Sequence, residues 1–219
     1  MQPLLKHHGL EFFGKYGGDD TMTEFNTTRV PNARARHNHE RILDALLTLL
    51  AEGVRDPRAQ QIAERAGVVV RTVFHQFPDM ATIYREAITR QAKLIQPTLK
   101  PFDVHLDVTE RSVLLIAQRD ELYAQMAPLH LAMRNHHDDA FVDLREYVAL
   151  RSAMTKQVRM TYLHELRRHS DPVEALSRLD AATSFEIWNY FREIQHASRT
   201  NTRAFMTRLV VNELGAFGA

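Results

Sequence analysis

Two groups of ionisable side chains in the second half of the chain have residue types that could bind a metal ion or perform catalysis. The sequence HHDD at residues 136–139 carries suitable ligand atoms, and His164, Glu165 and His169 repeat the same residue types. Adjacent residues at a helix junction point in diverging directions, so we interpret HHDD as a polar loop. The second group lacks two histidines four residues apart, the spacing that places both imidazoles on one helical face. Neither group predicts a metal site.

The sequence also lacks the motifs of common enzyme classes. It contains no H-E-x-x-H, no G-x-S-x-G and no glycine-rich phosphate loop. It has no Cys, which excludes thiolate nucleophiles, thiolate metal sites and disulfides. Paired Glu-x-x-His units, which a di-iron helix bundle needs, are missing as well. We therefore expect no enzymatic activity and no cofactor.

A more informative set of polar residues lies in the segment VRTVFHQ, residues 70–76, shortly after Gly67. Helical spacing leaves Arg71, Thr72 and His75 facing outward, while neighbouring valines face the preceding helix. An arginine can bind O6 and N7 of guanine together, a contact worth about 1–3 kcal/mol of discrimination between bases. The segment therefore has the chemistry to contact base pairs in a major groove.

The elements around this segment are short and must support one another. The apolar spacing predicts a helix over residues 37–52, and then a short one from Asp56-Pro57 to about residue 66, where Asp caps the helix and Pro occupies its first position. Helices this short are marginal alone, so the pair must be closely packed. Two short helices that cross at a tight turn are typical of a helix-turn-helix motif. Pro78-Asp79 is predicted to end the motif and cap a longer helix.

Three stretches in residues 36–95 resemble the DNA-binding domain of the TetR (tetracycline-repressor) family of bacterial transcription regulators. They are NHERILDALLTLLAEG, AQQIAERAGV and RTVFHQFPDMATIYREAI. The resemblance implies a three-helix DNA-binding domain, a helical regulatory domain, a homodimer and a palindromic operator. Val69, Phe74 and Met80 depart from the Ser or Thr, Tyr and Lys that are frequent in the family, which puts individual phosphate contacts in question.

The resemblance and the outward polar edge together predict a set of DNA contacts. Residues of the second short helix would meet base edges or the backbone, and residues at the start of the first would meet phosphates with the help of the helix dipole. A residue that precedes the long first helix would follow the backbone or enter the minor groove. The predicted contacts are Arg71, Thr72, Val70, Phe74, His75, Gln76, Arg58, Gln60 and Arg36.

Composition and charge agree with a helical protein that has a local basic region. The 219 residues are 44% hydrophobic and 25% charged, with only eight Gly and eight Pro. The net charge is +1, but residues 29–100 hold 12 Lys and Arg against 7 acidic residues, a local charge of +5. No stretch approaches the length of a membrane span, and the N-terminus does not follow a signal-peptide pattern. We expect a cytoplasmic protein that does not associate with membranes.

The predicted fold is all-α, with an N-terminal three-helix helix-turn-helix DNA-binding domain and a larger helical regulatory and dimerisation domain. Residues 1–33 show no sustained hydrophobic period and are interpreted as a flexible arm. The DNA-binding domain would cover residues 34–96 and the second domain residues 97–219, with Pro97 and Pro101 at the junction.

Beyond the junction, the apolar period predicts long helices at residues 109–135, 138–169, 171–195 and 202–214, and Pro128 should kink or break the first. If the family analogy holds, this domain binds an effector of apolar or aromatic character in a pocket of aromatic and Met side chains. The same side chains at helical spacing would also suit an ordinary core. The candidates are Tyr123, Met126, His130, Met133, Tyr147, Met154, Tyr162 and Trp188.

The last two predicted helices are apolar on more than one face, so they need a second partner besides their own core. We place dimerisation there, in the region through which the family dimerises by an intermolecular four-helix bundle. Helices central in a monomer would show the same pattern. The predicted interface residues are Leu176, Leu179, Phe191, Ile194, Phe205, Leu209 and Val210.

These features favour a sequence-specific, ligand-responsive repressor that binds a palindromic double-stranded operator as a homodimer. One alternative is a helical ligand-binding or partner-binding protein with a weakened DNA-binding module, suggested by Val69, Phe74 and Met80. A second alternative is an all-α enzyme, for which the sequence supplies no cluster of ionisable groups.

Overall fold

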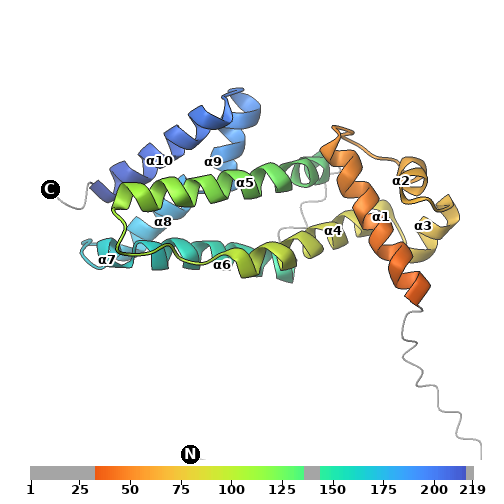
Figure 1. Cartoon of the computed structure of the whole chain (residues 1–219), viewed down its shortest axis with the longest axis horizontal. Helices are drawn as coiled ribbons and strands as arrows, with labels where there is room; N and C mark the ends of the chain where they lie inside the picture. The colour runs from red at the N-terminus through yellow and green to blue at the C-terminus, as the bar shows by residue number, and fades with distance from the viewer. Residues whose placement is uncertain (1–32, 136–143, 216–219) are drawn as a thin grey trace, which may run out of the picture. The chain divides into compact units, whose positions relative to one another are not determined.

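The computed structural model describes residues 33–135 and 144–215, and all regular structure in these two ranges is helical (Figure 1). The all-α prediction is therefore confirmed. The predicted arm lies outside the described residues except for Ala33, and the HHDD segment lies outside them entirely. Among the described helices, none combines the length and the apolar content that crossing a lipid bilayer requires.

Four helices form the N-terminal part: α1 (Ala33–Ala51), α2 (Ala59–Ala66), α3 (Val70–Gln76) and α4 (Met80–Ile95). The predicted bounds of α3 are confirmed, and Asp79 caps α4 by accepting a 2.6 Å hydrogen bond from the amide of Thr82. The predicted start of α2 at Asp56-Pro57 is wrong. Arg58 is the cap residue instead, because its amide donates a 2.9 Å hydrogen bond to Oε1 of Gln61 and closes the first turn there.

A short 3-10 turn, η1 (Gln96–Thr98), leads to the larger part of the chain. Its helices are α5 (Val108–Asn135), α6 (Arg145–Thr161), α7 (Leu163–Leu166), α8 (Pro172–Ala182), α9 (Phe185–Asn189), the π-helical turn η3 (Tyr190–Ile194) and α10 (Arg199–Gly215). The α5 helix continues through Pro128 without a break. The single helix predicted over residues 171–195 is wrong, because the chain leaves helical geometry at Thr183 and Ser184 before α9 begins.

The break between α8 and α9 has a local and a tertiary cause. The hydroxyl of Ser184 caps α9 by accepting a 3.3 Å hydrogen bond from the amide of Ile187. The carbonyl of Thr183 accepts a 2.7 Å hydrogen bond from the hydroxyl of Tyr123 on α5. The break therefore faces α5, in the interior of the larger part.

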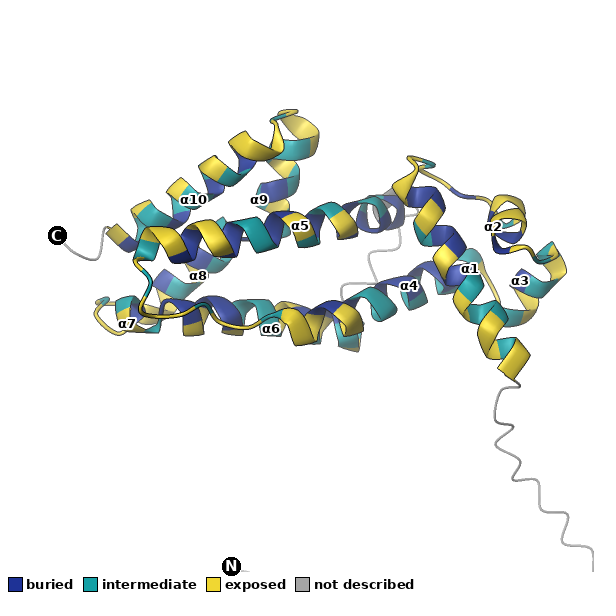
Figure 2. Ribbon diagram, in the orientation of Figure 1, coloured by how far each residue is buried: buried dark blue, intermediate teal, exposed yellow. Residues whose placement is uncertain are grey.

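The helices bury two apolar clusters, visible as the dark faces in Figure 2. The first joins α1 to α4 around residues such as Ile42, Ile62 and Phe77 and extends to the second half of α5 and the start of α6. The second joins α5, α6, α8 and α10, with Leu115 and Met206 fully buried in it. The core of the N-terminal helices is thus continuous with the larger part, although the chain between α4 and α5 contains little regular structure.

Candidate DNA-binding surface and internal cavity

The turn between α2 and α3 depends on Gly67, whose φ of +63° lies in the left-handed region. Its amide donates to the carbonyl of Glu64 at 3.1 Å, and the amide of Val68 donates to the carbonyl of Ala63 at 2.9 Å. This pair of bonds is a Schellman motif, in which glycine adopts positive φ without a steric penalty. The motif ends α2 sharply and directs the chain into α3 within a few residues.

Contacts from α1 and α4 hold this turn in place. Arg65 on α2 donates two hydrogen bonds, of 2.7 and 2.6 Å, to the carboxylate of Glu52 just after α1, and these bonds lower the pKa of Glu52. The ring of His39 on α1 stacks on Phe77 at the end of α3, with centroids 4.4 Å apart. Nε2 of His39 also lies 2.8 Å from a carboxylate oxygen of Glu86 on α4. The short helices therefore sit on a rigid support.

The α3 helix has one buried edge and one open edge. Val73 is completely buried, whereas Arg71 and His75 are exposed and Phe74 keeps 48% of its surface accessible. Arg71 forms no hydrogen bond or ion pair with any other described residue. The open edge therefore presents a solvated guanidinium and an imidazole beside an aromatic ring.

The other predicted contacts differ in how freely they face solvent. Thr72 and Gln76 are half-buried, and Val70 is half-buried against the first apolar cluster, so its side chain faces the core more than the open edge. The sequence analysis did not predict Val69 as a DNA contact, although Val69 is 68% exposed and directly precedes α3. Its exposure could have been anticipated, because it lies outside the apolar period of the two helices.

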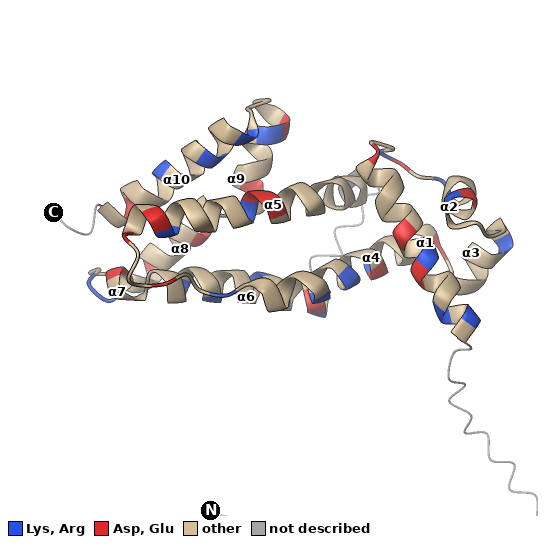
Figure 3. Cartoon of the chain, viewed as in Figure 1, with Lys and Arg blue, Asp and Glu red and all other residues tan. Residues whose placement is uncertain are grey.

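The remaining predicted contacts lie on α1 and around the start of α2. Arg58 and Arg36 are exposed. Gln60 is exposed too, but its amide nitrogen already donates a 2.8 Å hydrogen bond to Glu64. Figure 3 shows basic residues at the start of α1 and on α3, and the sequence of α3 contains no acidic residue. The predicted DNA contacts from Arg58 to Gln76 thus lie on two short helices that adjoin one another, or directly before them.

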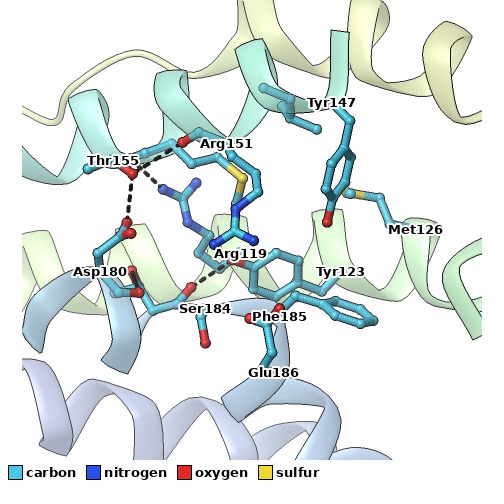
Figure 4. Close-up of a pocket in the computed structure, with 13 residues that line it drawn as sticks. Arg119, Tyr123, Met126, Tyr147, Arg151, Thr155, Asp180, Ser184, Phe185 and Glu186 are labelled. Atoms are coloured by element: carbon cyan, nitrogen blue, oxygen red, sulfur yellow. Dashed lines mark hydrogen bonds between the residues drawn. The ribbon is translucent and has the colours of Figure 1, made fainter. Parts of the chain in front are cut away.

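A cavity of about 40 Å³ lies where α5, α6 and the break between α8 and α9 meet (Figure 4), and two of its lining residues, Arg151 and Glu186, are exposed to solvent. Four of the predicted effector contacts line it: Tyr123, Met126, Tyr147 and Met154. His130 does not line it but lies beside it, because its ring centroid is 5.3 Å from that of Tyr147 and 5.1 Å from that of Phe185. One part of the cavity wall is therefore aromatic and thioether in character.

Burial shapes the acid–base properties of these groups. It lowers the pKa of His130 to about 4, against the opposing influence of the Glu186 carboxylate. It raises the pKa of Tyr123, whose hydroxyl is already engaged with the carbonyl of Thr183. Near neutral pH both side chains are uncharged.

Three other predicted effector contacts do not line this cavity, and their role in effector binding stays a prediction. Met133 is fully buried in the first apolar cluster. Tyr162 and Trp188 belong to the second cluster. The hydroxyl of Tyr162 lies 2.9 Å from that of Ser112, and the indole of Trp188 donates to Asp120 at 2.7 Å. Helical spacing alone could not separate cavity residues from core residues.

Sequence reasoning missed the polar part of the cavity. The missed lining residues are Arg119, Arg151, Thr155, Asp180, Thr183, Ser184 and Glu186. One signal for Arg119 was present, because it lies four residues from both Leu115 and Tyr123, on the apolar stripe of α5. A charged residue on a buried stripe of a helix is uncommon, and its burial is costly without an ion-pair or hydrogen-bond partner.

The predicted dimer-interface residues divide into accessible and inaccessible ones. Ile194 is 65% exposed, and Leu176, Phe191, Phe205 and Leu209 are half-buried. Leu179 and Val210 have no exposed surface, because both are enclosed by the second cluster of the subunit itself. They cannot meet a second subunit in this conformation, so their assignment to the interface does not fit the structure.

The described residues contain no group of three or more metal-binding side chains placed to share an ion. No family model matches the sequence, and no curated protein matches it either.

The solved structures that resemble this one include the following two. One, from Mesorhizobium loti MAFF303099, is described as a TetR-family transcriptional regulator; it superimposes with a TM-score of 0.58 at 16% sequence identity, covering 84% of this chain and 98% of that one. The other is a transcriptional regulator from Streptomyces coelicolor A3(2), with a TM-score of 0.43 and 25% identity, covering 80% of this chain and 98% of that one. The first comparison shows that this chain has the fold of that TetR-family structure.

Proposed function

We propose that this protein is a sequence-specific transcriptional regulator of the TetR type, a repressor that binds a palindromic operator as a homodimer. In this proposal, the α3 helices of the two subunits enter successive major grooves about 34–36 Å apart. The open edge of α3 is the observation that carries the proposal. An exposed arginine without an internal partner, held on a tightly braced short helix, is free to bind a guanine edge.

The residues around α3 would position the helix on the phosphate backbone. Arg58 and Arg36 are exposed cations that can neutralise phosphates without contributing sequence information. His75 and Gln76 extend the polar edge of α3 beyond Arg71. Each phosphate neutralised releases counterions, so the affinity for duplex DNA should fall steeply with salt.

The dimer would form through η3, α10 and α8. Ile194 and Tyr190 on η3 keep 65% and 47% of their surface accessible, and Phe205 on α10 packs against Phe191 with ring centroids 4.1 Å apart. A partly exposed aromatic and aliphatic surface of this kind favours contact with a second subunit. Leu176 and Leu209 would complete the contact, whereas Leu179 and Val210 stay in the core.

The ligand response would pass through α6. This helix contributes Tyr147 and Met154 to the cavity and also packs against α4, which supports the helix-turn-helix. A cavity of about 40 Å³ is far smaller than the roughly 300–1,000 Å³ of ordinary ligand sites, so a ligand must push its walls apart. A displaced α6 would shift α4 and change the separation of the two α3 helices. DNA and ligand would then favour different conformations, which couples the two sites reciprocally.

One observation favours a second candidate, a helical ligand-binding protein with a weakened DNA module. The α3 helix begins at Val69 without a side-chain hydrogen bond to cap it. A Ser or Thr there would cap the helix and offer a hydroxyl to a phosphate.

Selection of bound sites from random duplexes, followed by gel-shift titration over a range of salt concentrations, tests the proposal. We expect a palindromic site, and an affinity that falls with salt. Absent or salt-independent duplex binding would favour the second candidate. Arg71→Ala should lose discrimination between bases, while Arg159→Ala, an exposed arginine on α6, serves as the matched control.

A further inference from the structure

Two arginines lie buried on α5, about two helical turns apart, but only Arg111 forms an ion pair with a described carboxylate. Arg111 donates from Nη2 to Oε1 of Glu165 at 2.5 Å and from Nη1 to the carbonyl of Thr161 at 2.5 Å. Its guanidinium therefore has both a counterion and a backbone acceptor. Such a pairing is the ordinary way to keep a cation inside a protein.

Arg119 is more deeply buried, with 1% of its surface exposed. Its Nη2 donates a 3.1 Å hydrogen bond to the carbonyl of Met154 on α6. Its Nε and Nη1 atoms are enclosed and have no hydrogen-bond partner among the described residues. An arginine donates five N–H groups, so the Nε–H and both Nη1–H groups remain to be bonded. Arg119 lines the cavity described above, and Figure 4 shows its side chain reaching into it from α5.

No carboxylate of the described residues forms an ion pair with Arg119, although the nearby charge of Asp180 opposes the effect of burial on its pKa. Asp180 also lines the cavity, but its Oδ1 accepts a 3.0 Å hydrogen bond from the hydroxyl of Thr155, and Arg119 forms no ion pair with a described carboxylate. Burial lowers the pKa of Arg119, yet a guanidinium stays protonated near neutral pH. An enclosed cation with free donors is costly unless an anion meets it.

The walls around Arg119 indicate which kind of anion fits. Tyr123, Tyr147 and Phe185 supply aromatic surface, and Met126 and Met154 supply flexible side chains that can make room. Asp180 and Glu186 face the same cavity, so a doubly charged group such as a phosphate ester would meet repulsion. A single negative charge on an apolar or aromatic body suits both features.

We propose that the cavity binds an amphipathic carboxylate, whose anionic end accepts hydrogen bonds from Nε and Nη1 of Arg119 and whose apolar or aromatic body packs against Tyr123, Phe185 and the methionines. The carboxylate would occupy the same cavity that we propose as the effector site. The role of the carboxylate as an effector rests on the proposed regulatory function. Its binding to the cavity does not depend on that function. Since Arg119 also bonds the carbonyl of Met154, a ligand that recruits its guanidinium acts directly on the link between α5 and α6.

The single tryptophan of the chain offers a direct readout. Trp188 stacks on Phe185 with ring centroids 5.8 Å apart, so movement of Phe185 by a ligand should change the indole fluorescence. The full chain is titrated with phenylalkanoates of increasing chain length and with their primary amides, which match them in shape but lack the charge. Charge-assisted hydrogen bonds predict that the best carboxylate binds at least about tenfold more tightly than its amide.

Substitutions then assign the preference to Arg119. Arg119→Met should remove the preference for the carboxylate without loss of the fold, because it removes the cost of a buried charge and keeps a long, flexible side chain in its place. Arg119→Lys keeps the charge and should retain part of the preference. Arg159→Met, the same change at an exposed position on α6, should leave it unaltered. Circular dichroism checks the fold of each variant. If Arg119→Met does not fold, the proposal is tested by two other measurements: the preference of the wild type for acids over amides, and the preference of Arg119→Lys.

Equal affinity of the wild type for acids and amides, no binding of any phenylalkanoate, or a folded Arg119→Met that keeps the preference would each overturn the proposed site. Gel shifts with the selected duplex separate this result from the regulatory proposal. A carboxylate that binds through Arg119 but does not release DNA removes its role as effector and leaves the site intact. A protein that binds no duplex contradicts the proposed function without affecting the fluorescence result.

Discussion

The indole nitrogen of Trp188 donates a 2.7 Å hydrogen bond to Oδ1 of Asp120, whose other oxygen accepts from Arg199 at 2.9 Å and from Arg203 at 2.5 Å. The carboxylate of Asp120 is completely buried and so joins α5 to α9 and to the first turns of α10. Burial alone would raise the pKa of Asp120, but the hydrogen bonds from Trp188, Arg199 and Arg203 outweigh it and hold the pKa below its ordinary value.

Removal of this carboxylate should loosen the proposed dimerisation helices. Asp120→Ala leaves the buried indole N–H and two guanidinium groups without their shared acceptor, so we expect the free energy of unfolding to fall by about 3 kcal/mol. Chemical denaturation measures the loss. The neighbouring Glu121, which binds the same two arginines at the surface, gives the matched control, and Glu121→Ala should change stability little. Equal losses for the two variants would contradict the role assigned to Asp120.

Buried His130 predicts a specific loss of stability in mild acid. Its pKa of about 4 in the folded protein lies below the ordinary value of 6.5, so between these pH values the unfolded chain binds a proton that the folded chain does not. The contribution to stability is complete above pH 6.5 and falls by about 1.4 kcal/mol per pH unit as the pH drops toward 4. Near pH 5 the loss is about 2 kcal/mol.

The change His130→Gln tests this pH dependence, because glutamine is polar but does not titrate. The difference in unfolding free energy between wild type and variant should shrink as the pH is lowered from 7 to 5. Other groups titrate equally in both proteins, so they cancel in the difference. A difference that does not change with pH would show that His130 has the same pKa in the folded and the unfolded chain.

Of the described glycines with a positive φ, Gly53 and Gly67, only Gly67 has another atom close to the position that a Cβ would take. Gly67→Ala places a Cβ at a φ of +63°, where an L-residue is strained by about 1 kcal/mol. The added Cβ would also lie 2.5 Å from Nη2 of Arg41, which can move because it ends a flexible side chain. Gly215, in the last turn of α10, has no atom near the equivalent position and serves as the control. Thermal unfolding should show a lower midpoint for Gly67→Ala alone, and a similar shift at both sites would contradict the assigned strain.

The local signals in the sequence predicted the helix-turn-helix well. Asp79 was predicted as a cap, and it accepts a hydrogen bond from an amide that the start of α4 leaves unpaired. The bounds of α3 followed from the position of Gly67 and Pro78, which act on the backbone directly. Such signals depend on a few neighbouring residues, and for that reason they can be read without a structure.

The cavity could be predicted only in part, because it depends on packing between helices distant in the sequence. The break at Thr183 and Ser184 interrupts an otherwise continuous apolar pattern and is stabilised by Tyr123, some 60 residues away. Periodicity placed Tyr123 and Trp188 on inward-facing stripes, but it could not show that the first borders a cavity while the second is bound to Asp120. For the same reason the sequence did not identify Arg119 as a cavity residue. That two of its nitrogen atoms lack hydrogen-bond partners among the described residues is known only from the packed structure.

The two edges of α3 should respond differently to truncation. Val73 is completely buried, so Val73→Ala should reduce the free energy of unfolding by about 1–3 kcal/mol and weaken DNA binding only as far as the fold is lost. Arg71→Ala should leave stability unchanged, because the side chain is exposed and has no partner among the described residues. Denaturant titration and gel shift on the same two variants separate folding from recognition.

The most direct test of the proposed function is the affinity of Arg71→Ala for the selected palindrome and for a copy in which the guanine facing Arg71 is replaced. Wild type should prefer the palindrome, and Arg71→Ala should lose about 1–3 kcal/mol of that preference while its stability stays unchanged. If Arg71→Ala instead bound both duplexes with the wild-type affinities, α3 would not be the element that reads the DNA.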